Sequence, residues 1–369
     1  MDAPGPWGTG PFTLAEGYSS LYNEIAIQAA DPLTGIWLDT RQDRTPRVVL
    51  KANTDHWNRE RGPRLETVVF RNDLDSAEAL RLACDTEGEV DIVTEVSPAD
   101  ARRVRDSQHA RLVTTDAMRI VVGIINRDHA PFDDVRARRA LNLAVDRDKF
   151  VREGFGGYAH ATAGLTPHYA AGRAPDLEPY PHDPGQARGL LQESDYPAGR
   201  PLILAALPGM DGLANLLAGD LRSALGVEVI VVVIPEGNLL AAQHSFVEKV
   251  IPAPFDVLLF AWFDLTSDAP AAFMHSWLYG AMGAFRAGPP IPEFDQILDR
   301  YVRQTNGAEL NALDEQMDRL AHAQALSLFL CAPQALYAVN KHVSFVGHAT
   351  TFEVAETEVS EGHWSRRQA

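Results

Sequence analysis

The sequence predicts an α/β protein of two lobes. Its 369 residues are enough for two domains, each with a hydrophobic core of its own. Hydrophobic residues make up 46% of the chain and charged residues 22%, proportions that are typical of a globular protein. Segments with the periodicity of amphipathic helices alternate with short apolar segments that are typical of strands. This alternation indicates helices packed on a sheet.

Residues 123–158 form the stretch around which the rest of the chain is arranged. The apolar run at residues 120–125 predicts a strand, and Asp133 or Asp134 is placed to cap the helix that follows. The glycines in residues 154–157 predict the end of this helix, because glycine tolerates the left-handed backbone of many helix exits. The apolar face of the expected helix consists of Ala137, Ala140, Leu141, Ala144 and Val145.

The segment before this stretch shows the same alternation of strand and helix patterns. A turn at residues 8–12 opens it, and the expected elements are a short strand after that turn, strands at 47–57 and 62–70, a helix at 76–85 capped by Asp75, a strand that begins at 88–92 and a capped helix at 97–106. Residues 112–115 then lead into the central strand.

The segment after residue 158 continues the pattern. The expected elements are a loop at 159–172, a helix capped by Asp183, a strand at 202–207, a helix that ends at Gly226, strands at 227–235 and 257–260, helices at 271–277, 294–302 and 310–321, and an apolar return segment at 326–340. The strand at 227–235 is apolar on both faces, which predicts that it is buried in a sheet. The polar tail after Gly347 is expected to be loosely held.

Several motifs of this chain resemble one protein family in collinear order. Residues 126–147 carry Asn-x4-PF-x-D-x-RxRRALNxAVDR, and residues 8–12 carry GTGPF. A strand that ends in His-Trp at residues 56–57, a GEVDI segment at 88–92 and a Tyr-x-x-Asp-Pro helix start at 180–184 follow the same family pattern. Together they resemble the family 5 extracellular solute-binding proteins, the peptide- and nickel-binding receptors of ABC importers.

The resemblance implies a periplasmic-binding-protein-like fold of the class II, or cluster C, type. In such a protein two lobes close on a ligand about a hinge. It implies that residues 1–115, with 335–369 returning to them, are a remnant of the first lobe, and that residues 116–334 are the second lobe, an α/β unit. The first lobe is expected to be incomplete, because the family's N-terminal part has no counterpart in this sequence.

The expected ligand-binding cluster follows the buried strand at 257–260. Trp262, Phe263 and Asp264 come directly after it, and Asp268 follows four residues later. A carboxylate can pair with an ammonium group, and an indole offers a flat apolar surface. Peptide-binding members of the family hold the free amine of a peptide with the aspartate of a Gly-Trp-x-x-Asp segment. This chain has Ala261 in place of that glycine and one residue fewer before the aspartate, and either aspartate can instead cap the next helix.

The sequence gives little support for nucleic-acid binding, membrane insertion, catalysis or a cofactor. A net charge of −17 argues against a nucleic-acid partner and against an anionic membrane surface, and no apolar run is long enough to insert into a bilayer. The sequence contains no Walker A loop, H-E-x-x-H, G-x-S-x-G or C-x-x-C motif, so we expect neither a catalytic residue nor a cofactor. His160, His168 and His182 lie near one loop, which leaves open a metal site or three solvated side chains.

Two functions from different classes remain open. The first is the solute-binding component of an ABC importer, outside the cytoplasm, which binds a peptide or a similar small organic solute and passes it to a permease. The second is a cytoplasmic protein that reuses the same scaffold as a ligand-sensing module or a biosynthetic enzyme. The opening MDAPGPWGTGPF lacks the features of a signal peptide, which favours the second. The lack of catalytic motifs disfavours its enzymatic form, and the first function is our working hypothesis.

Overall fold

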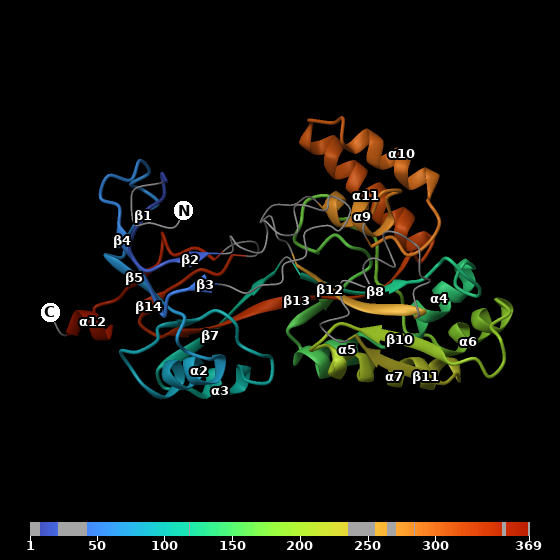
Figure 1. Ribbon diagram of the computed structural model, residues 1–369, viewed down its shortest axis with the longest axis horizontal. Helices are drawn as coiled ribbons and strands as arrows, with labels where there is room; N and C mark the ends of the chain where they lie inside the picture. The colour runs from blue at the N-terminus through green and yellow to red at the C-terminus, as the bar shows by residue number, and fades with distance from the viewer. Residues whose placement is uncertain are drawn as a thin grey trace. The chain divides into compact units, whose positions relative to one another are not determined.

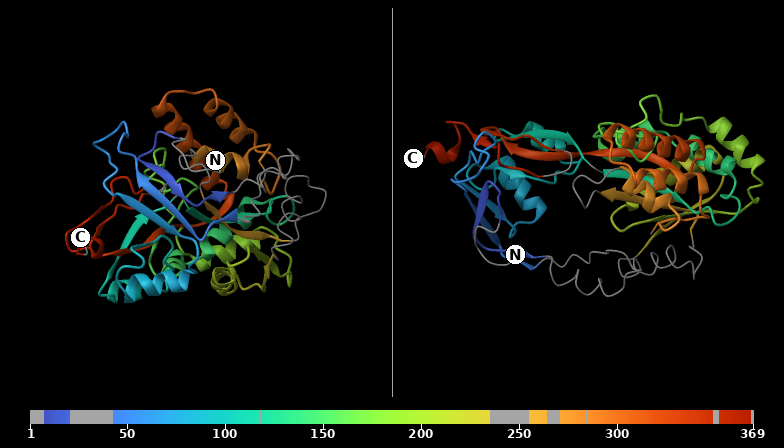
Figure 2. Two further views of the ribbon diagram at one scale, coloured as in Figure 1. Left: turned by 60° about the vertical axis from the view of Figure 1, so that its left-hand side comes forward. Right: turned by 90° about the horizontal axis from the view of Figure 1, so that it is seen from above.

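The computed structural model describes residues 8–20, 43–117, 119–234, 255–263, 271–283, 285–348 and 352–367 (Figure 1). The chain divides into two compact units. Unit 1 comprises Met1–Ala117 and Ala335–Ala369, and unit 2 comprises Met118–Gln334. Figure 2 shows the elements of each unit from two further directions. None of the helices in the described ranges combines the length and the apolar character needed to cross a membrane.

Unit 1 contains a three-stranded antiparallel sheet in the order β1-β4-β5. Its strands are β1 (Phe12–Glu16), β4 (Arg47–Ala52) and β5 (Thr67–Arg71). The predicted strand at 47–57 is too long, because the chain turns after Ala52. The carbonyl of Asn53 accepts a hydrogen bond from the amide of His56 at 3.0 Å, and this turn ends the extended backbone.

The two longer helices of unit 1 can be compared with the helices and caps that the sequence predicts. Helix α2 (Ser76–Asp85) begins as predicted, with the Asp75 carboxylate accepting a hydrogen bond from the Glu78 amide at 2.8 Å. Helix α3 (Ala101–Asp106) is shorter than the predicted helix at 97–106. Ser97 forms a turn ahead of it instead, in which its hydroxyl accepts a hydrogen bond from the Asp100 amide at 3.2 Å.

The C-terminal tail corrects the expectation that it is loosely held. The side chains of His363 and Trp364 each lie about 3 Å from one carboxylate oxygen of Asp91, at 3.0 Å and 2.9 Å. His363 is buried, which anchors this part of the tail to unit 1. The remaining elements of unit 1 are β2 (Ser19–Ser20), β3 (Asp43–Arg44), β6 (Ile92–Val93), β7 (Ala110–Asp116), β14 (Val343–Ser344), β15 (Glu358–Val359) and α12 (Trp364–Arg367).

The strands of unit 2 form a mixed sheet in the order β11-β10-β12-β8-β13, with β9 on the far side of β13. Strand β10 is parallel to β11 and β12, whereas β8 is antiparallel to both β12 and β13. The strands are β8 (Arg119–Ile125), β9 (Ala159–Ala161), β10 (Leu202–Ala206), β11 (Val229–Val233), β12 (Val257–Phe263) and β13 (Ser327–Asn340). The end of β13 belongs to unit 1, where it pairs with β6 and β7.

The helices of unit 2 form two groups. Helices of the first group pack on one another and, with the sheet, enclose the main hydrophobic core. The first group is α4 (Val135–Ala144), α5 (Arg147–Phe155), α6 (Pro184–Glu193) and α7 (Asp211–Leu225), and the second is α9 (Ala271–Tyr279), α10 (Pro292–Tyr301) and α11 (Gly307–Ala323). Figure 1 shows the second group above the strands and α5, α6 and α7 below them. The predicted caps Asp183 and Gly226 are confirmed.

The central stretch contains two helices rather than the one predicted. Asp134 caps α4, as one of the two predicted alternatives, but α4 ends at Ala144. Val145 is extended, and Asp146 caps α5 by accepting a hydrogen bond from the Lys149 amide at 2.9 Å. Gly156 then ends α5 in the left-handed conformation, with φ of 59°. An aspartate followed by charged residues was therefore a second helix start inside an unbroken apolar pattern.

Strand β11 corrects the expectation of a strand buried on both faces. In the described sheet it pairs only with β10 and so lies at the edge. Ile230, Val232 and Val233 are each at least 40% exposed. An apolar sequence does not distinguish an edge strand from a central one, because the position of a strand depends on pairing with distant segments.

Arg147 and Asn142 connect the α4–α5 junction to β13 through a buried hydrogen-bond network. The Arg147 guanidinium donates to the Phe329 carbonyl at 2.8 Å, to the Asn142 carbonyl at 2.9 Å and to the Tyr180 carbonyl at 3.0 Å. The Asn142 side chain donates to the Ser327 carbonyl at 3.0 Å. Burial lowers the pKa of Arg147 to about 10, so the group stays charged at neutral pH.

We expect Arg147→Lys to destabilise the protein by about 3 kcal/mol, because lysine keeps the charge but cannot donate in several directions from a planar fork. The measurement is urea unfolding. Arg152→Lys is the matched control on the same helix: Arg152 has an exposed side chain, and we expect a change within about 0.5 kcal/mol. Equal effects of the two substitutions would contradict a structural role for the Arg147 network.

Candidate functional site

The predicted binding cluster begins at the end of β12, a strand in the interior of the sheet. Strand β12 lies between β10 and β8, and the backbone of Trp262 and Phe263 pairs with that of Ile120 and Arg119. Asp264 and Asp268 lie outside the described residues, as do the side chains of Trp262 and Phe263. The backbone therefore places the first two cluster residues at the end of a central strand, where the binding sites of α/β sheets are often found.

A buried ion pair fixes the start of β12. The Asp256 carboxylate accepts two hydrogen bonds from the Arg200 guanidinium, at 2.6 Å and 3.0 Å. It also accepts one from the Ile203 amide of β10 at 2.8 Å. Asp256 is 1% exposed, and a bidentate pair of this kind fixes orientation as well as position. The pair thus holds β12 and β10 in register at the end of β12 away from the predicted cluster.

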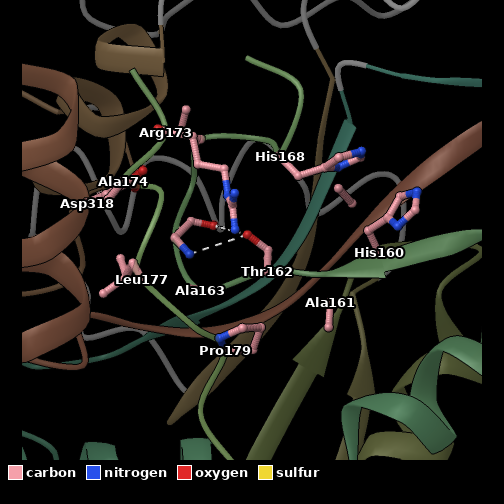
Figure 3. Close-up of a pocket in the computed structure, with 13 residues that line it drawn as sticks. His160, Ala161, Thr162, Ala163, His168, Arg173, Ala174, Leu177, Pro179 and Asp318 are labelled. Atoms are coloured by element: carbon pink, nitrogen blue, oxygen red, sulfur yellow. Dashed lines mark hydrogen bonds between the residues drawn. The ribbon is translucent and has the colours of Figure 1, made fainter. Parts of the chain in front are cut away.

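A small pocket lies between the segment that follows α5 and helix α11 (Figure 3). Its walls come mainly from residues 160–179, with Asp318 of α11 and Ala332 of β13. The Thr162 hydroxyl donates to the Gly164 carbonyl at 2.7 Å and shapes one wall. The interior volume is about 30 Å³, the space that one water molecule occupies. This pocket is too small for a peptide.

The structure brings together two of the three histidines of the predicted loop. The rings of His160, on β9, and His168 lie with their centroids 4.1 Å apart, and both residues line the small pocket. His182 is located elsewhere, with its Nδ1 atom 4.0 Å from the Asp146 carboxylate. The predicted loop at 159–172 thus begins with strand β9, which pairs with β13. The structure therefore does not place all three histidines around one metal site.

A buried His–Asp pair lies beneath the pocket. The Nε2 atom of His275, on α9, is 2.9 Å from an oxygen of Asp318, and both side chains are almost fully buried. The same oxygen accepts a hydrogen bond from the Leu165 amide at 3.0 Å. A Cβ atom at Gly164 would lie 2.3 Å from that oxygen, so the chain needs a glycine there. Asp318 thereby binds the pocket segment to α11.

Asp314 is a second buried carboxylate, one helical turn before Asp318. In the described part of the chain its Oδ1 atom has no hydrogen-bond partner. Burial, with a smaller contribution from the nearby Asp318 carboxylate, raises the pKa of Asp314 to about 6 against the opposing charge of His275. Burial opposes ionisation of Asp318 as well, but His275 holds the pKa of Asp318 below its usual range. The two carboxylates therefore differ in protonation at weakly acidic pH, below about 6.

The sequence analysis did not single out His275, Asp314 or Asp318. The available signal was the spacing of the two aspartates, four residues apart along one side of α11 and next to its buried residues Leu313 and Met317. Acidic residues at that spacing beside an apolar face indicate buried carboxylates. Their partner comes from α9, about 40 residues earlier, and periodicity could not identify it.

The chain is similar to known binding proteins in sequence. A family model described as "Bacterial extracellular solute-binding proteins, family 5 Middle" matches residues 3–284. The chain is 28% identical to a probable di/tripeptide-binding protein 5 of Pseudomonas aeruginosa, over 89% of this chain and 63% of the relative. It is 25% identical to heme-binding protein A of Haemophilus influenzae, over 84% of this chain and 57% of the relative. The chain thus spans about six-tenths of the length of these relatives.

The fold is also similar to solved structures. A putative peptide-binding protein AppA from Clostridium difficile aligns with a TM-score of 0.76 at 15% identity, over 96% of this chain and 68% of that chain. NikA from Brucella suis, solved in complex with Fe(III)-EDTA, aligns with a TM-score of 0.70 at 19% identity, over 95% of this chain and 67% of that chain. These matches show the predicted cluster C periplasmic-binding-protein fold over most of the chain, which is shorter than the solved chains.

We expect Asp314 to make stability depend on pH. The folded protein holds the Asp314 proton up to about pH 6, whereas an unfolded chain releases it near 3.8, so the free energy of unfolding falls as pH rises between these values. Asp314→Asn removes this loss. The variant should be about 2 kcal/mol more stable than the wild type at about pH 7.5 and similar to it at about pH 4.

The measurement is urea unfolding of both proteins at the two pH values. Glu315→Gln is the matched control, because Glu315 is the adjacent residue of the same helix and its side chain is 36% exposed. A difference between the wild type and Asp314→Asn that is the same at both pH values would contradict the assigned protonation of Asp314.

Proposed function

Because the chain belongs to the family 5 bacterial extracellular solute-binding proteins, we propose that it is the solute-binding component of an ABC importer. The observation that carries this proposal is the family match over residues 3–284, together with the shared fold. The names of the relatives cover di/tripeptides, glutathione and heme. Several of these relatives are named for di/tripeptides or dipeptides, and several for glutathione, which is itself a tripeptide; this supports a peptide or a similar small organic solute as the ligand.

The proposed activity is binding without catalysis. The relatives are named as binding proteins, and the sequence lacks the motifs of hydrolases, nucleotide-dependent enzymes and zinc enzymes. The proposed partners are the ligand and an ABC permease, and the proposed location is outside the cytoplasm, as the family description indicates. We also propose that unit 2 corresponds to the second lobe and unit 1 to the part of the first lobe that this chain contains.

Residues 262–268 are the proposed ligand-binding cluster. The support is their place in the chain directly after β12, whose start is fixed by the Arg200–Asp256 pair. In this proposal the Asp264 carboxylate pairs with the ammonium group of the ligand, while Trp262 and Phe263 supply apolar surface. Asp268 lies closer in sequence to α9, and its alternative role is to cap that helix.

A ligand screen tests the proposed function. The purified 369-residue chain is heated with dipeptides, tripeptides, glutathione, heme or nickel salts, and the unfolding temperature is recorded. A ligand present at about 100 times its dissociation constant should stabilise the fold by about 2.7 kcal/mol. We expect the largest shift with a peptide that has a free amine. A folded protein that responds to none of these classes would contradict the proposal.

Asp264→Asn tests the amine contact. Loss of an ion pair with an ammonium group should weaken binding of a responding peptide by about 30-fold, and isothermal titration calorimetry measures this. The same peptide with an acetylated amine should bind the wild type and Asp264→Asn equally weakly. Asp268→Asn is the matched control and should change affinity less than about threefold. A larger loss in Asp268→Asn than in Asp264→Asn would transfer the role to Asp268.

A further inference from the structure

Arg127 is a buried cation whose charge has no direct partner in the described part of the chain. It lies two residues after the end of β8, and only 5% of the residue is exposed. Its backbone amide donates to the Ala287 carbonyl at 2.9 Å, but among the described residues its guanidinium makes neither a hydrogen bond nor an ion pair. Buried charges are normally paired, because removing an ion from water costs several kcal/mol. The Arg127 side chain therefore requires an explanation.

The backbone at Gly288 leaves room for the Arg127 side chain. Gly288 has φ of 153°, and a Cβ atom there would lie 2.9 Å from the Arg127 Cζ atom. Any larger residue at position 288 would therefore collide with the guanidinium. Burial, followed by the nearby charge of Arg138, lowers the pKa of Arg127 to about 10, so the group still carries its charge at neutral pH.

Arg127 lines a pocket in unit 2 with a volume of about 400 Å³. That volume is within the range of sites that hold small organic molecules. The lining also includes Pro289, Pro290 and Ile291, which are apolar. Two carboxylates, Asp133 and Glu293, also line the pocket, but both residues are exposed to solvent, where water screens their charge.

Arg138 adds a second positive charge to the same pocket. Its guanidinium donates to the carbonyls of Phe132 at 3.0 Å, Asp133 at 2.9 Å and Gln324 at 2.8 Å. These acceptors fix the position of the side chain but are neutral, and no ion pair of Arg138 exists among the described residues. Two buried guanidinium groups therefore line one cavity without an ion pair among the described residues, although the carboxylates of Asp128, Asp133 and Asp134 lie near enough to favour their charged forms.

We propose that this pocket binds the carboxylate of a small organic acid, with Arg127 as the primary contact. A guanidinium matches a carboxylate through two parallel hydrogen bonds, and this contact gives Arg127 the partner that the described residues do not supply. The proline and isoleucine wall accommodates a small apolar group on the acid. The inference goes beyond the proposed transport function and does not depend on it, because all lining residues belong to unit 2 and none lies in residues 262–268.

The test uses sodium butyrate as the probe and the full chain as the protein. Calorimetric titration of the wild type should show saturable binding of butyrate, whereas butyramide, its neutral counterpart, should not bind. Arg127→Gln should weaken butyrate binding by about tenfold or more. Arg152→Gln, which removes an exposed charge from α5, is the matched control and should leave the affinity unchanged.

The variant should fold, because Arg127→Gln removes an unpaired buried charge, and its unfolding temperature without butyrate should equal or exceed that of the wild type. If the variant does not fold, nitrogen-15 NMR spectra of the arginine side chains are recorded for the wild type instead. One arginine resonance should then shift saturably as butyrate is added. The proposal is overturned if the wild type does not bind up to about 100 mM butyrate, or if Arg127→Gln binds equally well. If sulfate binds saturably and butyrate does not bind, the proposal is also overturned, and the ligand is then an inorganic oxyanion.

Discussion

The buried network of Arg147 and Asn142 is the interaction on which the architecture of unit 2 depends. It joins two helices to β13 through backbone carbonyls, so the helices and the strand keep one relative position. Both residues belong to the motif that carries the family resemblance. The structural role of these two residues accounts for their place in the motif: a guanidinium in a dry core needs several acceptors, and α4, β13 and the segment before α6 provide them.

The local signals in the sequence predicted the elements that local physics decides. Asp75, Asp183 and Gly226 marked helix ends correctly, because capping depends on residues within one turn. Some errors concern local turns and a second helix cap at Asp146, but two concern features that depend on distant parts of the chain. The edge position of β11 depends on strand pairing, and the anchored tail depends on Asp91, about 270 residues earlier. Periodicity carries no information about such partners.

The candidate sites also differ in whether their residues are close together or far apart in the sequence. The cluster at Trp262 and Asp264 could be proposed from the sequence, because the family pattern that it resembles lies in one continuous segment, and it stays a prediction. The pair of Asp318 and His275 and the cavity around Arg127 could not, since each combines segments that are far apart in the sequence. In both cases the charged residues were visible in the sequence, but the number and kind of their partners became clear only in three dimensions.

The division of the chain has a consequence for the order of folding during synthesis. Unit 2 is continuous, whereas unit 1 needs residues from both sides of it. Strands β6 and β7 leave the ribosome early, yet both pair with β13, whose unit 1 residues are synthesised after all of unit 2. Unit 2 can therefore complete its core before β6 and β7 can pair with β13. Until then the backbone hydrogen-bonding groups of these two strands are open to water or to a chaperone.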